Sequence, residues 1–321
     1  MRRFYKKGGC ILKTMKIASF FAGCGGVDLG FHQAGCKTVY ANEIDKNPVH
    51  TYEMNFGIKV DNRDIRKVSA NDVPDVDIIC GGFPCQAFSS LGKQLGFEDE
   101  RGTLFFDMAR IIREKQPSIV FFENVVNLVY RKHEFIAIIE AIQSLGYYVK
   151  HKILDAAKYG NVRQHRSRVY IVGFKDKNQF NRFSFPDEIK LTSTIDDFVD
   201  RNNDEYDEYK IDSLKNADKL KAVMDDDESF YQFKYGQYVK KTDKVCFTIA
   251  ANISGLQVPS FKTKYGVRRI TPREAFNLQG FPATFKIDNN QSKTILYKQA
   301  GNSVCVPVIK RIAEKIVEAV G

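Results

Sequence analysis

The sequence predicts an α/β fold, in which a mostly parallel sheet carries helices on both faces and a smaller, irregular second domain follows. Three observations predict it. Short apolar runs alternate with amphipathic stretches through the first half of the chain, which is typical of parallel sheets with crossover helices. A glycine-rich segment follows the first of these runs, as in Rossmann-like folds. The alternation then stops after about residue 186, where the composition changes.

The expected strands are rich in Val, Ile, Phe or Tyr and are bounded by Gly, Asp or Asn. In chain order they are Lys16–Phe21, Thr38–Asn42, Val76–Gly81, Ile119–Glu123, Tyr147–Leu154 and Val169–Phe174. The amphipathic stretches expected as helices between them are Val27–Ala34, Pro48–Asn55, Thr103–Glu114 and Glu134–Leu145. Ligands of such sheets bind at the carboxyl ends of the strands, so the loops there are the first candidates for function.

The later part of the chain lacks this regular pattern. Residues 196–228 are rich in Asp, Asn and Lys, and residues 229–270 carry aromatic and basic side chains with short β-like runs such as Cys246–Ala250. A helix is predicted over Thr271–Phe281, because Thr-Pro-Arg-Glu makes a good capping start. Val304–Val320 is predicted to be an amphipathic helix that packs back on the first domain.

These boundaries predict two domains. The first spans residues 1–190 and is completed by residues 290–321, and the smaller one, with its hinge, spans residues 191–289. Two domains of moderate size fit a chain of 321 residues.

Charge and cysteine usage narrow the function class. The net charge of +10 makes nucleic acid a candidate partner, because a basic surface concentrates polyanions. The seven cysteines show no CxxC or CxxH spacing, so we expect no zinc or other metal site and no disulfide framework. No apolar run reaches the length of a membrane span, and the start MRRFYKKGG lacks the apolar core of a signal peptide. A cytoplasmic protein is expected.

The glycine-rich segment Phe20-Phe21-Ala22-Gly23-Cys24-Gly25-Gly26 follows the first expected strand and opens the first helix. Its glycines let the backbone approach a ligand, and the helix start offers free N–H groups. Glu43 ends the second strand about 20 residues later, where an acidic residue commonly bonds ribose hydroxyls. The spacing is G-x-G-G rather than G-x-G-x-x-G, so an adenosyl ligand without a pyrophosphate is at least as good a candidate as a dinucleotide. The alternative is a structural turn with a solvated Glu43.

The segment GGFPCQAFS, residues 81–89, places Cys85 behind a proline at the end of a buried strand. Most free cysteines are small buried hydrophobes. A stiff glycine- and proline-containing turn with polar Ser89 nearby instead favours a thiol that is lifted into a cleft to react.

Two further groups follow at neighbouring strand ends. Glu123 comes after four apolar residues, so its carboxyl group is expected to be partly desolvated and able to hold a proton. The alternative is a strand-end acid satisfied by water. Arg166 and Arg168 alternate in QHRSR, which places them on one side of an extended segment and predicts a shared anionic partner. Taken alone, this pair could equally be an exposed basic edge.

Together these motifs resemble the cytosine-5 DNA methyltransferase family, of bacterial and phage type. FAGCGG, GGFPCQAFS, ENV at 123–125 and QHRSR occur in order, and RRITPREAFNLQGFP (268–282) and YKQAGNSVCVPVI (297–309) resemble the family's C-terminal motifs. The resemblance covers nearly the whole chain except residues 1–14 and the region around 187–265. It implies a methyltransferase sheet domain that uses S-adenosylmethionine, with S-adenosylhomocysteine as product, and a target-recognition domain.

The resemblance also implies site residues. Cys85 would attack C6 of cytosine, Glu123 would bond N3, and Arg166 and Arg168 would hold the base through O2 and position the nucleophile. Glu43 would bond the ribose and Asp64 the adenine amino group, although the family often has Gly-Asp where this chain reads Asn62-Arg63-Asp64. The full set assigned to the cofactor is Phe21, Gly23, Cys24, Gly26, Glu43, Ile44, Asp64, Ile65, Gly82, Pro84, Leu104, Asn302, Ser303 and Val304.

The implied substrate is double-stranded DNA with the target cytosine flipped out of the stack. Candidate DNA contacts from the loop after Cys85 and from the variable segment are Ser89, Gln94, Arg101, Tyr235, Gln237, Lys240, Thr248 and Asn252. We expect a monomer without an obligate partner, with a cognate restriction endonuclease as a separate possibility. The motifs do not specify the recognised sequence.

Three alternatives remain open on the sequence. A transfer-RNA methyltransferase on the same fold would carry Cys-Phe-Thr, but here Cys246-Phe247-Thr248 lies inside VCFTIAAN, which resembles the DNA enzymes' Thr-Leu/Ile-x-Ala stretch. A catalytically dead DNA-binding homologue is disfavoured by the joint presence of Cys85, Glu123 and the two arginines. A nicotinamide-dependent dehydrogenase fits the glycine segment alone.

Overall fold

The computed structural model describes residues 5–7, 10–12, 14–84, 104–203, 205–225, 228–234, 237–241 and 243–321. The chain forms two compact units. The first comprises Met1–Leu154, Ser167–Pro186 and Val308–Gly321, and the second comprises Asp155–Arg166 and Asp187–Pro307. The units differ from the expected domains, because residues 155–166, 187–190 and 290–307 belong to the second unit. The expected assignment of functions to domains stays a prediction.

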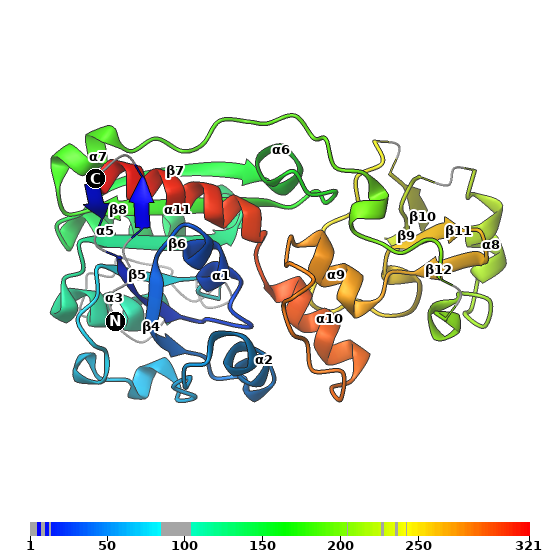
Figure 1. Cartoon of the computed structure of the whole chain (residues 1–321), viewed down its shortest axis with the longest axis horizontal. Helices are drawn as coiled ribbons and strands as arrows, with labels where there is room; N and C mark the ends of the chain where they lie inside the picture. The colour runs from blue at the N-terminus through cyan, green and yellow to red at the C-terminus, as the bar shows by residue number, and fades with distance from the viewer. Residues whose placement is uncertain are drawn as a thin grey trace. The chain divides into compact units, whose positions relative to one another are not determined.

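The first unit is built on a six-stranded sheet in the order β4-β3-β5-β6-β8-β7 (Figure 1). Its strands are β3 Lys16–Phe20, β4 Lys37–Asn42, β5 Ile78–Gly81, β6 Ile119–Val125, β7 Tyr148–Asp155 and β8 Ser167–Phe174. β3 pairs in parallel with β4 and β5, β5 pairs in parallel with β6, and β8 is antiparallel to β6. The predicted mostly parallel α/β sheet is confirmed. A small hairpin, β1 Tyr5–Lys7 and β2 Cys10–Leu12, precedes it.

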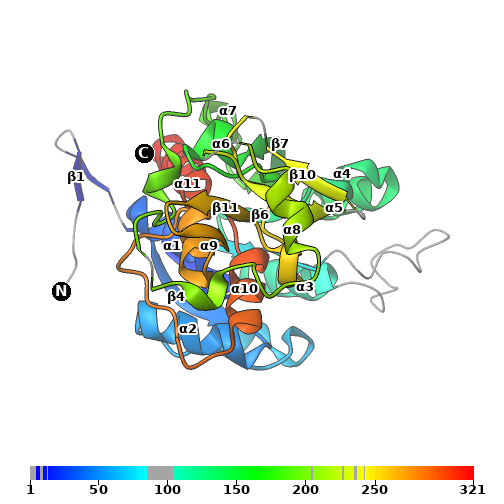
Figure 2. The same cartoon turned by 90° about the vertical axis from the view of Figure 1, so that its right-hand side faces the viewer.

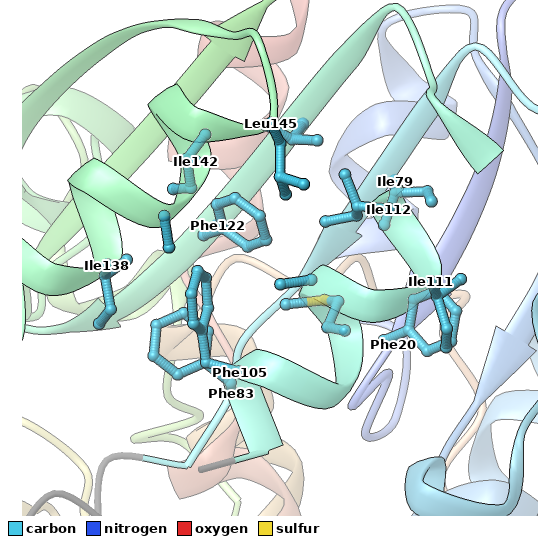
Figure 3. Packing of buried hydrophobic residues seen from close by; sticks show 14 of the residues in the cluster. Phe20, Ile79, Phe83, Phe105, Ile111, Ile112, Phe122, Ile138, Ile142 and Leu145 are labelled. Carbon is cyan, nitrogen blue, oxygen red and sulfur yellow. The ribbon is translucent and has the colours of Figure 1, made fainter. Parts of the chain in front are cut away.

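Helices cover both faces of this sheet. They are α1 Gly26–Gln33, α2 Lys46–Phe56, α3 Leu104–Lys115, α4 Asn127–Tyr130, α5 Lys132–Ser144, α7 Lys177–Arg182 and, across the unit boundary, α11 Val306–Val320. On one face, Phe20, Ile79 and Phe122 of the strands pack with residues of α3 and α5 (Figure 3). On the other face, Phe31 of α1 meets Phe121 edge-on, with ring centroids 5.2 Å apart. The period-2 alternation of apolar side chains therefore supplies both layers.

The carboxy-terminal helix packs within the first unit, as the amphipathic pattern predicts. Gly30 of α1 lies against it, because a Cβ at position 30 would come within 2.5 Å of the Cβ of Ile309. Of the described residues, none forms a helix long and apolar enough to cross a membrane.

The second unit contains a four-stranded antiparallel sheet in the order β10-β9-β11-β12. Its elements are β9 Tyr231–Lys234, β10 Gln237–Lys240, β11 Ser260–Thr263, β12 Gly266–Arg269, α6 Ala156–Gly160, α8 Ala217–Ala222, α9 Pro272–Leu278 and α10 Lys293–Asn302. Short 3-10 turns lie at Ile65–Lys67, Ala70–Asp72, Ile195–Asp197, Asp207–Tyr209 and Gly255–Gln257. The helix predicted from Thr271 begins as expected, since the Thr271 hydroxyl accepts from the Glu274 amide.

The β-like run Cys246–Ala250 is not a strand. Its backbone bonds instead to the segment before β8: the Cys246 amide donates to the Arg163 carbonyl at 2.8 Å, and the His165 amide donates to the Cys246 carbonyl at 2.9 Å. The buried amide side chain of Gln164 accepts from the Ile249 N–H at 3.2 Å. These hydrogen bonds pair backbone N–H and C=O groups of the run without placing it in a sheet.

A buried ion pair stabilises the second unit. The Arg268 guanidinium donates to both carboxylate oxygens of Glu274, at 2.8 and 2.7 Å, and lies over the Phe261 ring. Glu274 also accepts from the amides of Thr271 and Asp200. Both charges are almost wholly buried, so the removal of one leaves the other uncompensated.

We therefore expect Glu274→Ala to lower the free energy of unfolding by about 3–5 kcal/mol. Urea denaturation followed by circular dichroism measures it. The control is Glu318→Ala, which removes an exposed carboxylate paired with Lys315 and should cost at most about 1 kcal/mol. Equal losses in the two variants would contradict the assignment of a structural role to the buried pair.

Candidate active site

The glycine segment forms a cradle between β3 and α1. Phe21, Gly23 and Gly25 have positive φ angles of 51°, 54° and 92°. Position 25 requires glycine, because a Cβ there would lie 2.2 Å from the Phe56 ring. At Gly23 no described atom lies within 4 Å of such a Cβ, so this side of the loop is open in the described part of the chain. Gly26 starts α1 without a side-chain cap from the described residues, which leaves its first N–H groups for a ligand.

Glu43 is tied to this cradle. Its carboxylate accepts from the Gly23 amide at 2.9 Å and from the Asp45 amide at 2.8 Å. Burial raises the pKa of Glu43, and these backbone hydrogen bonds lower it in part. The side chain of Asn62 donates to the Glu43 carbonyl at 2.7 Å and so fixes the end of β4. The next residue, Ile44, is 59% exposed beside this acid.

Asp64 lies on the segment after α2, which runs beside the end of β4. Asn42 donates from its side chain to the carbonyls of Asp61 and Arg63, both at 2.8 Å, which holds this loop to β4. The Asp64 carboxylate accepts from the side chain and the amide of Arg66, and these bonds, the side-chain one foremost, lower the pKa of Asp64 to about 2. Ile65 differs from its neighbour, since it is buried in the core.

The end of β5 is anchored beside the end of β6. The side chain of Asn124 donates to the Phe83 carbonyl at 2.9 Å, and the Phe83 ring packs on Phe105 and Phe122. A Cβ on Gly82 would lie 3.4 Å from a carboxylate oxygen of Glu123. The chain thus runs past Glu123 and reaches Pro84, which is exposed. Cys85, Ser89, Gln94, Arg101 and Tyr235 lie outside the described residues.

Glu123 and Arg168 form an ion pair from adjacent antiparallel strands. Arg168 Nε lies 3.1 Å from Glu123 Oε1, and the side chains are 14% and 11% exposed. The strand pairing of β6 with β8 brings them together. The Glu123 side chain is therefore largely removed from solvent, as expected, and it is paired with a guanidinium.

Arg166 has a different environment. It is buried, and it donates to the carbonyls of Ile249 at 3.1 Å, Gly301 at 2.9 Å and Ser303. A cation is favoured there because the last carbonyls of α10 are unsatisfied within the helix. Arg168 thus pairs with a carboxylate, whereas Arg166 donates to backbone carbonyls; the shared anionic partner expected from their alternate spacing stays a prediction.

A family model described as C-5 cytosine-specific DNA methylase matches residues 15–318. The chain belongs to this family. It is 46% identical over 311 residues to the Type II methyltransferase M.Bsp6I of Bacillus sp. (strain RFL6), covering 94% of this chain and 98% of that relative. It is 35% identical over 323 residues to the Type II methyltransferase M.HhaI of Haemophilus parahaemolyticus, covering 95% of each.

Solved structures share the fold of this chain. The solved structure of the S. pombe Dnmt2 methyltransferase matches with a TM-score of 0.73 and 18% identity, covering 96% of this chain and 100% of that one. The chain is accordingly a DNA cytosine-5 methyltransferase, and its family uses S-adenosylmethionine as methyl donor. Family membership removes the nicotinamide-dependent dehydrogenase from the alternatives.

The remaining cofactor candidates of this methyltransferase are spread over both units. Leu104 begins α3 in the first unit, and Cys24 is buried in the glycine segment. In the second unit, Asn302 is exposed at the end of α10, whereas Ser303 and Val304 are buried. Their roles stay predictions.

The described DNA-contact candidates also differ among themselves. Gln237 and Asn252 are exposed. Lys240 pairs with Asp225 at 2.5 Å, and the Thr248 hydroxyl donates to the His165 carbonyl at 2.5 Å. The first two side chains are therefore better placed to meet DNA than the last two.

Sequence reasoning gave no role to Asn124, Asn42 or Gln164, which hold the loops of the site. Asn124 lies inside the ENV motif, so its position beside Glu123 was a usable signal. Gln164 donates to the Leu278 carbonyl 114 positions away, and no local pattern predicts such a bond.

Proposed function

We propose that this enzyme transfers a methyl group from S-adenosylmethionine to C5 of a flipped-out cytosine, within a short specific sequence of double-stranded DNA, through a covalent bond between Cys85 and C6. The arrangement at the end of β5 supports it most directly. The Asn124 side chain donates to the Phe83 carbonyl, and Gly82 lies next to the Glu123 carboxylate. The backbone that leads to Cys85 therefore lies beside Glu123, the residue proposed to bond the cytosine.

Cys85 is also favoured by the state of the other thiols. Every cysteine whose side chain is described is buried. Burial raises the pKa of Cys36 to about 12 and raises the pKa of Cys80 well above its ordinary value. A thiol held protonated in this way is a poor nucleophile, because the thiolate is the reactive form.

The chemistry requires a soft nucleophile. The Cys85 thiolate donates an electron pair to C6 of cytosine, the C5=C6 electrons become available at C5, and the Glu123 carboxyl donates a proton to N3, which neutralises the negative charge that develops in the ring. C5 then accepts the methyl group, and S-adenosylhomocysteine is left as the product. Loss of the C5 proton to a base restores the C5=C6 double bond, the electron pair of the C6–sulfur bond returns to Cys85 as a thiolate, and N3 gives its proton back to Glu123.

The described residues fit the methyl donor. S-adenosylmethionine supplies an electrophilic methyl group when it is bound. The open side of Gly23 leaves room for a ligand at the start of α1, and the half-buried Glu43 carboxylate stands where a ribose acceptor is needed. Asp64, whose lowered pKa keeps it ionised, can accept from an adenine amino group. Ile44, which is exposed beside Glu43, offers an apolar contact for the adenine ring of the methyl donor.

Base flipping costs a few kcal/mol, which contacts to the duplex must offset. We assign these contacts to the loop after Cys85 and to the variable segment of the second unit, in which Gln237 and Asn252 are exposed amides. The relatives are Type II methyltransferases, which supports a role in restriction–modification with a separate cognate endonuclease. We propose that the enzyme acts as a monomer.

The assignment of substrate is tested by incubating the protein with tritiated S-adenosylmethionine and either duplex DNA or transfer RNA. Label is expected in DNA, and bisulfite sequencing of that DNA reveals the recognised site. Label in RNA alone would favour a transfer-RNA enzyme, and label in neither substrate would favour a DNA-binding protein without activity.

A further inference from the structure

The turn that joins α4 to α5 carries an exposed cluster of Tyr130, Arg131, Lys132 and His133, here called the basic-aromatic patch. Tyr130 is 75% exposed, the largest exposure of any described large hydrophobic side chain. Among the described residues, no hydrogen-bond or ion-pair partner engages the four side chains. These groups are therefore available to a partner.

The patch is held on a fixed backbone. Leu128 before it and Phe135 after it are buried in the core. The Arg131 amide donates to the Asn127 carbonyl at 3.2 Å, and the Arg131 carbonyl accepts from the Phe135 amide at 3.0 Å. Figure 2 shows α4 beside the start of α5. Because this backbone is already anchored, the cationic residues lose little backbone freedom when they bind a partner.

Its place along the chain links it to the site. β6 ends at Val125, directly after Glu123 and Asn124, and α4 begins at Asn127. The patch therefore follows the carboxyl end of the strand that carries Glu123. Acidic residues are scarce there: between 124 and 139 the sequence contains only Glu134, which lies in the first turn of α5, where the helix dipole favours it.

Other surface lysines differ from those of the patch, because they already have an acidic partner. Lys240, Lys244 and Lys293 each have a carboxylate partner, Asp225, Glu228 and Glu208 respectively. A cation that already has an acid partner must give it up to bind a phosphate, whereas Arg131 and Lys132 need not.

We infer that the basic-aromatic patch binds backbone phosphates of the duplex beside the target cytosine, with Arg131 and Lys132 as the charged contacts and the Tyr130 hydroxyl as an added donor. The inference rests on the proposed function. Contacts of this kind set the position of DNA without reading its sequence, and each neutralised phosphate adds to the salt dependence of binding.

The test compares wild type with the double variant Arg131→Gln/Lys132→Gln, by measuring the Kd for a cognate and a non-cognate duplex across a range of salt. The double variant is expected to bind both duplexes more weakly and to lower the slope of log Kd against log salt by about 2. The ratio of the variant's Kd to the wild-type Kd should fall roughly tenfold between about 50 and 200 mM salt. Tyr130→Phe should weaken binding of both duplexes alike, with no change of slope.

The matched control is Lys16→Gln/Lys37→Gln. It removes the same charge from two exposed lysines at the amino ends of β3 and β4, and it should leave the slope near that of wild type. Equal slopes in the two double variants, or a loss of affinity for transfer RNA without a loss for duplex DNA, would overturn the inference. A wild-type protein that methylates no DNA would instead overturn the proposed function.

Discussion

Cys85→Ser is expected to abolish methylation of duplex DNA, with a loss of at least about a thousandfold in kcat. A serine hydroxyl is scarcely ionised at neutral pH and is a harder nucleophile, so it cannot form the bond to C6 at a useful rate. Binding of the duplex should persist, because the change removes one sulfur and keeps the shape of the side chain. Transfer of tritium from S-adenosylmethionine to DNA measures the first effect, and a gel-shift titration measures the second.

Cys36→Ala is the matched control. Cys36 is a buried thiol whose pKa is raised to about 12, so its loss should leave kcat near the wild-type value. A Cys85→Ser enzyme that kept more than about a tenth of the wild-type rate would remove Cys85 from the chemistry, since loss of a true nucleophile costs far more.

Glu123→Gln is expected to lower kcat by about 10²–10⁴-fold, the range typical of a group that bonds the reacting base as charge develops. Glutamine has nearly the same shape, but it cannot donate a carboxyl proton to N3, and it does not form the ion pair with Arg168 at 3.1 Å. The loss should appear in kcat more than in the Kd for DNA, because the contact matters most when the ring carries charge. Single-turnover kinetics separate the two.

The control for Glu123→Gln is Asp75→Asn. It removes a carboxylate that also pairs with a cation, Lys115, but this side chain is 97% exposed and lies on the loop before β5. It should change kcat by less than about threefold, in keeping with the small worth of exposed pairs. Similar effects of the two substitutions would show that Glu123 acts only through general electrostatics.

The strands of the six-stranded sheet could be predicted because composition, alternation and boundary residues agreed over each of them, whereas the short strands β1 and β2 were not predicted. β3 and β6, for example, differ from the expected segments by one or two terminal residues. The helix α10 was missed, because its buried residues include a polar amide and a glycine and so form no clear apolar stripe; they are Leu296, Tyr297, Gln299, Ala300 and Gly301. The strands of the second unit have four residues each, too few for a periodic pattern to be distinct.

The site, too, could be predicted only where local sequence patterns determine it. The sequence placed the glycine segment and Glu43 at the ends of two expected strands, and in the structure the Gly23 amide donates to the Glu43 carboxylate. The surroundings of Arg166 could not be predicted, since its partners are the carbonyls of Ile249, Gly301 and Ser303, far away in the sequence. Motif spacing is local, whereas the burial of a guanidinium depends on distant backbone.

The most direct test of the thiol mechanism uses duplex DNA with 5-fluorocytosine at the methylated position. Fluorine at C5 cannot leave as a proton does, so the enzyme should stay bonded to C6 once S-adenosylmethionine is added. We expect a complex that survives denaturing electrophoresis and a modified peptide that maps by mass spectrometry to Cys85. The absence of any adduct with a duplex that the enzyme methylates, or an adduct on another side chain, would contradict the account.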